Sequence, residues 1–257
     1  MTGISLSLSN KTALITGGSR GIGAAAVRMF TAAGARVAFN YQKSRSEADK
    51  LATQCGADKA FALQADLSSA EAGEALVRSA VERLGRLDIL VANHGIWPPE
   101  DLGIEAMPAD RWRHTTAVNL ESVYGLVKAA VGQMKAQGDG GKIVIVSSTA
   151  GQRGEAFHSD YAATKGAIIS MVKGLSTELA RDRIYVNCVA PGWVDTELVK
   201  SALNNSDKQR QVTKAIPLGR VGRPEEIAAP ILFLCTDHAG FVTGEVLNVN
   251  GGEALVG

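Results

Sequence analysis

Short apolar segments alternate with longer amphipathic segments along most of the chain. The apolar segments predict strands at residues 12–15, 36–40, 61–64, 87–92, 142–147, 185–189 and 246–249. The segments between them predict helices at about residues 22–33, 45–55, 69–84, 109–137, 161–180 and 224–235. Several strands are apolar at consecutive positions, which is typical of strands covered on both faces. This alternation predicts βαβ units and therefore a parallel sheet.

No change in composition and no internal repeat marks a linker in the 257 residues. We therefore expect one α/β domain over residues 1–257, with a Rossmann-like, doubly wound fold. Its seven-stranded parallel sheet would carry helices on both faces. Residues 193–223 are more polar and less regular, and they follow Pro191 and Gly192 between a strand and a helix. They are interpreted either as a substrate-covering segment or as a variable surface loop.

Composition excludes several classes of protein. A hydrophobic fraction of 46% and a charged fraction of 21% are typical of a globular protein, not of a disordered chain, a coiled coil or a collagen-like fibre. The net charge of +1 gives no support to a nucleic-acid or anionic-membrane partner. The 3 cysteines are far apart and lack a CxxC or Cys/His pattern, so neither a disulfide framework nor a metal site is expected. Without a signal-like start or a long apolar segment, the protein is expected to be cytoplasmic.

A glycine-rich turn, TGGSRGIG at residues 16–23, follows the first strand and opens the first helix. Glycines permit a tight turn and a close approach of a pyrophosphate to the backbone, and the helix start offers N–H groups. The spacing of Gly17, Gly21 and Gly23 is GxxxGxG, unlike the usual GxGxxG fingerprint. A plain βα turn could have this composition, but the first βα turn of an α/β chain is where phosphate binding concentrates.

The end of the second strand indicates which dinucleotide would bind. An NAD site usually has an acidic residue there for the ribose 2′-hydroxyl, whereas this chain has no acid before Glu47. Asn40, Arg20, Lys43 and Arg45 would accept a 2′-phosphate, although any one of these basic side chains could simply be a solvated charge. The pattern favours NADP(H) over NAD(H).

Tyr161 and Lys165 lie four residues apart on a predicted helix, so their side chains share one face. A nearby ammonium stabilises a phenolate, so such a tyrosine can exchange a proton with a carbonyl or alcohol oxygen. Ser148 stands at the end of a predicted strand and could donate a hydrogen bond to the same oxygen, while Ser147 should point the other way. An exposed helix pair and a strand-end serine are the alternative interpretations.

In their joint order and spacing, these motifs resemble the short-chain dehydrogenase/reductase family over essentially the whole chain. The matching positions are Thr16-Gly17-x-x-x-Gly21-x-Gly23, Asp66-Leu67, Ala92-Asn93-His94-Gly95, Asn119, Ser148, Tyr161-x-x-x-Lys165 and Pro191-Gly192-Trp193-Val194-Asp195-Thr196. One departure is His94, where the family commonly has a small residue; it would lie close to the cofactor or pack beside it.

The resemblance implies a catalytic set and a quaternary form. Tyr161 would be the acid/base, Lys165 would lower its pKa and hold the nicotinamide ribose, and Ser148 would polarise the carbonyl. Asn119 would hold a water in a proton relay, unless it is a solvent-facing helix residue. A homotetramer is also implied.

The resemblance further implies a bound NADP(H). Asp66 would contact the adenine, although it could instead cap a helix. The implied cofactor-binding residues are Gly17, Ser19, Arg20, Gly21, Ile22, Gly23, Asn40, Tyr41, Asp66, Leu67, Asn93, Gly95, Tyr161, Lys165, Pro191, Gly192, Val194 and Thr196.

Three sequence segments most resemble β-ketoacyl-acyl-carrier-protein reductases: NYxxS, IPLGRVGRPEEIA and FVTGEVLNVNGG. The resemblance implies NADPH-dependent reduction of a 3-oxoacyl thioester, free or bound to an acyl carrier protein. Lys135, Arg181 and Arg183 are candidate carrier contacts, but Gln137 and Asp182 stand near positions where basic residues are expected.

Other functions share these motifs. One alternative is a sugar, polyol or xenobiotic-ketone dehydrogenase of the same family. Two others, from different classes, are a non-catalytic dinucleotide-binding sensor and a structural protein that uses only the fold. Trp97, Trp193 and Phe157 could form walls of a substrate site or pack elsewhere. His158 could line that site, but an exposed loop position is the favoured interpretation.

Overall fold

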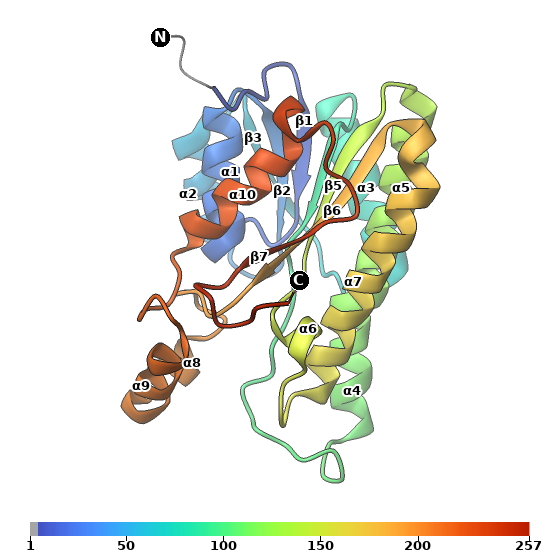
Figure 1. Cartoon of the computed structure of the whole chain (residues 1–257). Coiled ribbons are helices and arrows are strands. Elements are labelled where there is room, and N and C mark those ends of the chain that lie inside the picture. The colour runs from blue at the N-terminus through green and yellow to red at the C-terminus, as the bar shows by residue number, and fades with distance from the viewer. Residues whose placement is uncertain (1–4, 257) are drawn as a thin grey trace.

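A computed structural model describes residues 5–256 and contains seven parallel strands in the order β3-β2-β1-β4-β5-β6-β7 (Figure 1). The strands are β1 (Thr12–Ile15), β2 (Arg36–Tyr41), β3 (Ala60–Gln64), β4 (Ile89–Ala92), β5 (Gly141–Val146), β6 (Ile184–Pro191) and β7 (Val246–Val249). Leu14 of β1 pairs with Ala38 of β2 on one side and Leu90 of β4 on the other. The strand order reverses at this point, which confirms the doubly wound, Rossmann-like fold. Residues 1–4 and 257 of the predicted domain lie outside the described residues.

Helices cover both faces of the sheet (Figure 1). One face carries α1 (Gly21–Ala32), α2 (Arg45–Cys55) and α10 (Pro224–Cys235), and the other carries α3 (Ala70–Leu84), α5 (Ser122–Gln137) and α7 (Ser159–Leu179). Successive residues of a strand enter opposite cores: Ile15 packs with the first set of helices and Leu14 with the second. The uninterrupted apolar runs in the sequence follow from this double burial.

The predicted helix at residues 109–137 is not continuous, so that prediction was wrong in one respect. It consists of α4 (Ala109–Thr116), a π-helical turn at Ala117–Glu121, and α5. The widened turn contains Asn119, whose side chain is fully buried and hydrogen-bonded to the backbone of Ile96. No proline or glycine occurs in this turn, so nothing in the local sequence marks the irregularity.

The less regular segment at residues 193–223 contains α8 (Lys200–Leu203) and α9 (Ser206–Ala215). Asn205 caps α9, because its side-chain oxygen accepts from the backbone N–H groups of Asp207 and Lys208 at 3.0 and 3.1 Å. A further short helix, α6 (Ala150–Arg153), follows β5 and was not expected. Single 3₁₀ turns occur at Ala180–Asp182 and Asp237–Ala239.

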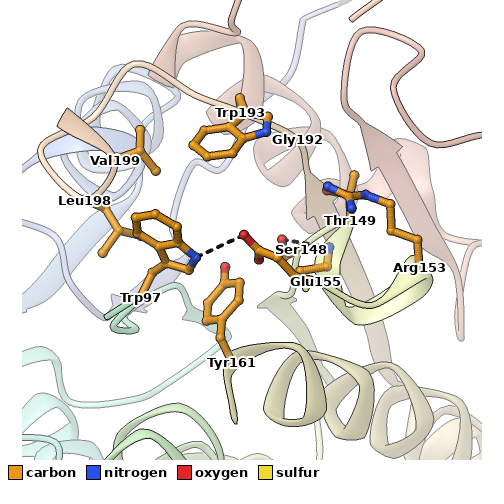
Figure 2. Close-up of a pocket in the computed structure, with 11 residues that line it drawn as sticks. Trp97, Ser148, Thr149, Arg153, Glu155, Tyr161, Gly192, Trp193, Leu198 and Val199 are labelled. Carbon is orange, nitrogen blue, oxygen red and sulfur yellow. Dashed lines mark hydrogen bonds between the residues drawn. The ribbon is translucent and has the colours of Figure 1, made fainter. Parts of the chain in front are cut away.

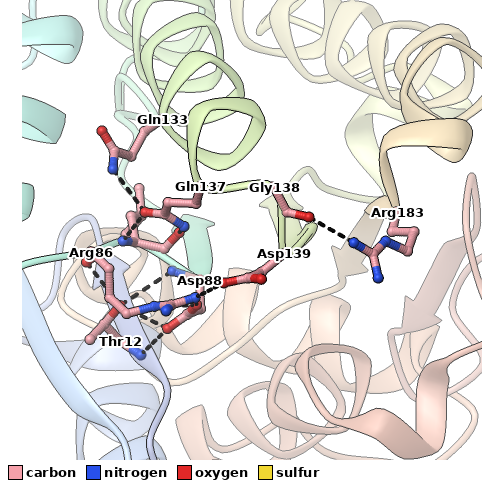
Figure 3. A network of polar contacts seen from close by, with 9 residues as sticks. Thr12, Arg86, Asp88, Gln133, Gln137, Gly138, Asp139 and Arg183 are labelled. Carbon is pink, nitrogen blue, oxygen red and sulfur yellow. Dashed lines mark hydrogen bonds and ion pairs between the residues drawn. The ribbon is translucent and has the colours of Figure 1, made fainter.

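A polar network joins the starts of β1 and β4 (Figure 3). The carboxylate of Asp88 accepts hydrogen bonds from the Thr12 backbone N–H at 2.8 Å and from the Arg86 guanidinium at 2.7 Å. Arg86 also pairs with Asp139 at 2.9 Å, and the side chain of Gln137 bonds both backbone groups of Leu87 at 2.8 Å. The network holds the amino ends of the central strands, at the edge of the sheet opposite the clefts described below.

We expect Asp88→Ala to lower the free energy of unfolding by about 2–4 kcal/mol, because it leaves the buried Thr12 N–H without its acceptor and removes one of the two carboxylate partners of Arg86. Urea unfolding followed by tryptophan fluorescence measures this change. Asp139→Ala is the matched control: its side chain is 63% exposed, so its loss should cost less than about 1 kcal/mol. Equal losses in the two variants would contradict a special role for Asp88.

Three further findings concern membrane-spanning helices, clusters of metal ligands and disulfides. Among residues 5–256, no helix combines the length and apolar character needed to cross a bilayer. In the same range, no three His, Cys, Asp or Glu side chains gather as metal ligands. Cys55, Cys188 and Cys235 are free thiols.

Candidate active site

A long cleft runs along the carboxyl ends of the strands, where the sheet order reverses. Two predicted site residues, Gly23 and Asn119, lie behind its wall. The predicted residues that line it are Gly17, Ser19, Arg20, Gly21, Ile22, Asn40, Tyr41, Asp66, Leu67, Asn93, Gly95, Ser148, Tyr161, Lys165, Pro191, Gly192, Val194 and Thr196. The sequence-predicted residues therefore meet in one place although they come from the ends of six strands and from helix α7.

The glycine-rich turn fits a dinucleotide phosphate. Gly17 and Gly21 have φ values of +62° and +54°, which residues with a Cβ rarely adopt. Among the described residues, no side chain caps the start of α1, and its first turn holds no acidic residue. Uncapped N–H groups and the positive end of the helix dipole therefore face the cleft.

The second strand places its polar side chains differently from expectation. Asn40 is buried, and its amide bonds internally: its oxygen accepts from the Gly17 N–H at 2.7 Å, and its nitrogen donates to the Ala65 carbonyl at 3.2 Å. Asn40 thus shapes the glycine-rich turn. Arg20 and Lys43 line the cleft, whereas Arg45 lies outside its lining and pairs with Asp49 at 3.7 Å.

Asp66 and Leu67 line the cleft after β3. Ser69 caps α3 in place of Asp66, since its hydroxyl accepts from the Ala72 N–H at 3.2 Å. The N-cap of α3 is therefore Ser69 and not Asp66.

Asn93 and His94 join the ends of β1 and β4 at the switch point. The Asn93 amide donates to the Thr16 carbonyl at 3.0 Å. The His94 ring lies between the Thr16 hydroxyl at 2.8 Å and the Ser122 hydroxyl at 2.7 Å. Burial, assisted by the Lys165 charge, lowers the pKa of His94 to about 3, so the ring is neutral near pH 7. His94 therefore braces the cleft without adding a charge to it.

Tyr161 and Ser148 converge at the inner end of the cleft. Tyr161 enters from the first turns of α7 and Ser148 from the end of β5, and both line the cleft. Burial is the main reason that the pKa of Tyr161 is raised to about 12; a hydrogen bond with Ser148 opposes the rise, and the Glu155 charge adds to it. The phenol is therefore protonated over the physiological range and can act as a proton donor. The neighbouring Ser147 points away, as expected, and donates to the Lys165 carbonyl at 2.8 Å.

Lys165 lies beneath Tyr161 on the same helix face. Its ammonium is 5.7 Å from the centroid of the Tyr161 ring and donates to the Val146 carbonyl at 2.9 Å. Burial lowers the pKa of Lys165 to about 8, so most molecules carry the charge at neutral pH. The expected lowering of the Tyr161 pKa by Lys165 is not found, because burial raises that pKa. A phenolate formed at Tyr161 would still be stabilised by the Lys165 charge.

Asn119 is not solvent-facing. Its oxygen accepts from the Ile96 N–H at 2.8 Å, and its nitrogen donates to the Ile96 carbonyl at 2.9 Å and to the Thr164 hydroxyl at 3.4 Å. Both amide hydrogens are therefore in use. A role of Asn119 in a water relay would have to involve its backbone carbonyl.

A second, smaller cavity opens beside Tyr161 and Ser148 (Figure 2). Trp97 and Trp193 form part of its wall, with ring centroids 6.0 Å apart, while Phe157 is 58% exposed. Glu155 also lines it, and its carboxylate accepts from the Trp97 indole N–H at 3.2 Å.

His158 stacks on the other face of Trp97 at 4.6 Å and is only 2% exposed. The exposed loop position favoured for His158 was therefore wrong. The stacking partner lies 61 positions away in the sequence (158 minus 97), so local patterning could not have shown it.

Comparison with known proteins decides the family. The family model described as "Enoyl-(Acyl carrier protein) reductase" matches residues 17–253. A solved short-chain type dehydrogenase/reductase from Mycobacterium marinum is 32% identical, superposes with a TM-score of 0.89, and shares 98% coverage of both chains. The chain belongs to the short-chain dehydrogenase/reductase family.

Named relatives in this family differ in substrate. The 3-oxoacyl-[acyl-carrier-protein] reductase FabG of Chlamydia trachomatis is 39% identical over 96% of this chain and 98% of its own. An L-rhamnose 1-dehydrogenase (NAD(P)(+)) of Azotobacter vinelandii is also 39% identical, over 95% of this chain and 97% of its own. This short-chain dehydrogenase/reductase is thus an NAD(P)-dependent oxidoreductase, as the sequence predicted.

Some residues around the two cavities had no clear signal in the sequence. Arg153 is the last residue of α6, Glu155 lies in the loop before α7, and Leu198 and Val199 lie in the segment after β6. None of them belongs to a family motif named above. Only the position of residues 193–223 beyond a strand end pointed to the last two.

Proposed function

We propose that this short-chain dehydrogenase/reductase uses NADP(H) to interconvert a carbonyl compound and a secondary alcohol. One observation carries the proposal: Ser148 and Tyr161 line both the dinucleotide-sized cleft and the smaller cavity. A substrate in the cavity would therefore meet these side chains beside the nicotinamide, which supplies or accepts the hydride when the cofactor is bound.

Each side chain has a distinct role in this proposal. In carbonyl reduction, the Tyr161 hydroxyl donates its proton to the substrate oxygen, and Ser148 donates a hydrogen bond to the same oxygen. The Lys165 ammonium stabilises the resulting phenolate. In alcohol oxidation the proton moves in the reverse direction. This intact set is the reason for preferring an enzyme over a non-catalytic dinucleotide sensor or a purely structural protein.

The preference for NADP(H) rests on charge at the end of β2. Arg20 and Lys43 line the cleft, and Asn40 stands where an NAD site usually has an acid. We expect the double variant Arg20→Glu/Lys43→Glu to lower the ratio of NADPH to NADH affinity by about 30-fold, because a carboxylate repels the 2′-phosphate. Fluorescence titration with each nucleotide measures this ratio. Arg45→Glu, outside the cleft lining, is the control; a ratio unchanged in the double variant would remove the phosphate-binding role.

Two substrate classes are candidates. The FabG relative supports a 3-oxoacyl thioester, free or bound to an acyl carrier protein. The rhamnose dehydrogenase relative supports a sugar or polyol at the same level of identity. Of the candidate carrier contacts, Lys135 pairs with Asp182 at 2.8 Å. Arg181 and Arg183 lie beyond the far end of α7, about 30 Å from Tyr161 along the helix, so they do not border this chain's own cavity.

Residues 193–223 would cover the bound substrate, since Leu198 and Val199 line both cavities. The homotetramer and the cytoplasmic location remain predictions from the sequence. The proposed activity is tested by following absorbance at 340 nm with acetoacetyl-coenzyme A and NADPH, and with aldoses or polyols and NADP⁺. Turnover of either class supports it, and protein that binds NADPH but turns over no carbonyl or alcohol would favour the sensor.

A further inference from the structure

The cavity beside Tyr161 contains a carboxylate that the proposed reaction does not use. Glu155 lies in the loop between α6 and α7 and is half-buried. Its side chain points into the space above the Tyr161 hydroxyl, between Trp97 and Ser148 (Figure 2). We propose that Glu155 makes this cavity selective for a polyhydroxylated substrate, by accepting hydrogen bonds from hydroxyl groups next to the reacting carbon. This inference rests on the proposed function of the same site.

The Glu155 carboxylate has acceptor positions that a substrate can occupy. The oxygen Oε1 accepts from the Trp97 indole N–H at 3.2 Å, which fixes the carboxylate in the cavity wall. Among residues 5–256, no group donates a hydrogen bond to Oε2. An ionised carboxylate has about four acceptor positions and no donor, so it is suited to hydroxyl hydrogens. Adjacent hydroxyl groups of one substrate could donate to two of the remaining positions.

The free acceptor positions of Glu155 cost free energy because the carboxylate is half-buried. Burial raises the pKa of Glu155, which shows that its charged form is poorly solvated in the cavity. A hydrogen-bond donor on the substrate would relieve this cost, and a substrate without donors would leave it in place.

Among the described residues, no other charged group near the cavity donates a hydrogen bond to the Glu155 carboxylate. The Arg153 guanidinium, at the end of α6, pairs with Glu253 at 3.3 Å. His158 stacks flat on Trp97, and no hydrogen-bond partner for its Nε2 atom exists within the described residues. Because Arg153 is paired with Glu253, Glu155 is the carboxylate left to face the substrate. A neutral molecule with several hydroxyl groups would supply the hydrogen-bond donors that it lacks.

The aromatic walls of the cavity also suit a polyhydroxylated substrate. Trp97 and Trp193 meet edge to face, with ring planes 78° apart, and both line the cavity. Aromatic faces pack well against the C–H groups of a sugar ring or polyol while a carboxylate takes its hydroxyls. A 3-oxoacyl thioester, by contrast, presents only acceptor atoms near the reacting carbon. Its oxygens would face Glu155 without a hydrogen to share.

The test compares substrates that differ in one adjacent hydroxyl. Oxidation of trans-1,2-cyclohexanediol and of cyclohexanol by NADP⁺ is followed at 340 nm, and the ratio of the two kcat/KM values measures selectivity. We expect the wild-type enzyme to prefer the diol, and D-glucose, L-rhamnose or sorbitol to be better substrates than acetoacetyl-coenzyme A. Glu155→Leu should lower the diol-to-alcohol ratio by about 50-fold, since a site built to bind a hydroxyl discriminates strongly. Glu155→Gln should lower it by about 10-fold, because it keeps an oxygen for Trp97 but loses the charge.

Two controls separate a specificity role from a structural one. Glu82→Gln, at an exposed position of α3, should leave the ratio unchanged. The affinity of each Glu155 variant for NADPH, whose cleft Glu155 does not line, reports whether the fold is intact. Variants that slow both alcohols equally would show a structural role only and would overturn the inference.

The choice of substrate distinguishes the two proposals. A wild-type enzyme that turns over acetoacetyl-coenzyme A, or a cationic amino ketone, far better than any polyol would also overturn the inference while leaving the proposed reaction intact. Absence of turnover with every compound, in protein that binds NADPH, would instead contradict the proposed function itself.

Discussion

Replacing Tyr161 by phenylalanine is expected to lower kcat for carbonyl reduction by about 10³-fold or more while NADPH binding persists. The variant keeps the ring that packs with Trp97 and Ala150 and removes only the hydroxyl. Because burial holds the phenol protonated, with a pKa of about 12, the hydroxyl carries the proton that the product alcohol needs. The loss should therefore appear in kcat, measured at 340 nm at saturating substrate, and not in cofactor affinity.

Tyr124→Phe is the control for the Tyr161 variant. Tyr124 lies on α5 and is 53% exposed, so removing its hydroxyl should leave both kcat and cofactor affinity unchanged. A Tyr161→Phe enzyme that retained a tenth of the wild-type rate would identify another group, such as Ser148, as the main proton donor. The assignment of roles in the candidate active site would then be wrong.

Replacing Gly23 by alanine is expected to weaken NADPH binding by at least 100-fold, about 2.7 kcal/mol. A Cβ atom at this position would lie 2.1 Å from the Gly17 carbonyl oxygen and 2.8 Å from the Asn93 amide nitrogen. Both neighbours are held in place by the switch-point contacts, so the glycine-rich turn must move away from the geometry that suits a phosphate. The affinity is measured by fluorescence titration, and a lower Tm should accompany it.

Gly132→Ala distinguishes this steric effect from a general effect of glycine replacement. Gly132 lies within α5, and a Cβ there would meet no atom within 4 Å. Alanine favours a helix over glycine by about 1 kcal/mol, so this variant should bind NADPH normally and melt at the same or a higher temperature. Normal NADPH affinity in Gly23→Ala would show that the turn adapts and that its close packing is not required.

The sheet and the cofactor cleft could be predicted because their signals are local. A strand buried on both faces must be apolar at each position, as at Leu14 and Ile15, and a phosphate turn needs glycines in sequence. The sites of Tyr161, Lys165 and Ser148 follow from helix periodicity and from the end of a strand. These features survive in the sequence because each depends on residues close together in the chain.

The substrate cavity could not be predicted in the same way. In the sequence, Glu155 looks like an ordinary acidic loop residue. Its place in the cavity becomes visible only in the fold, where Trp97, 58 positions earlier, donates a hydrogen bond to it. The burial of His158 and the internal bonding of Asn40 likewise depend on contacts between distant segments. Sequence patterns report periodicity and local turns, whereas these properties arise from tertiary packing.

The π-helical turn at residues 117–121 changes the direction in which the side chains of α5 point relative to those of α4. An α-helix turns by about 100° per residue, so one extra residue in a turn rotates all later side chains by that angle relative to the earlier ones. Before the shift, Thr115 bonds Asp160 of α7; after it, Leu126 enters the core shared with α3. Deleting one residue here would permit an unbroken helix, but only one of these two faces could then meet its partner. The irregular turn therefore allows two consecutive helices to pack against different partners, α4 against α7 and α5 against α3.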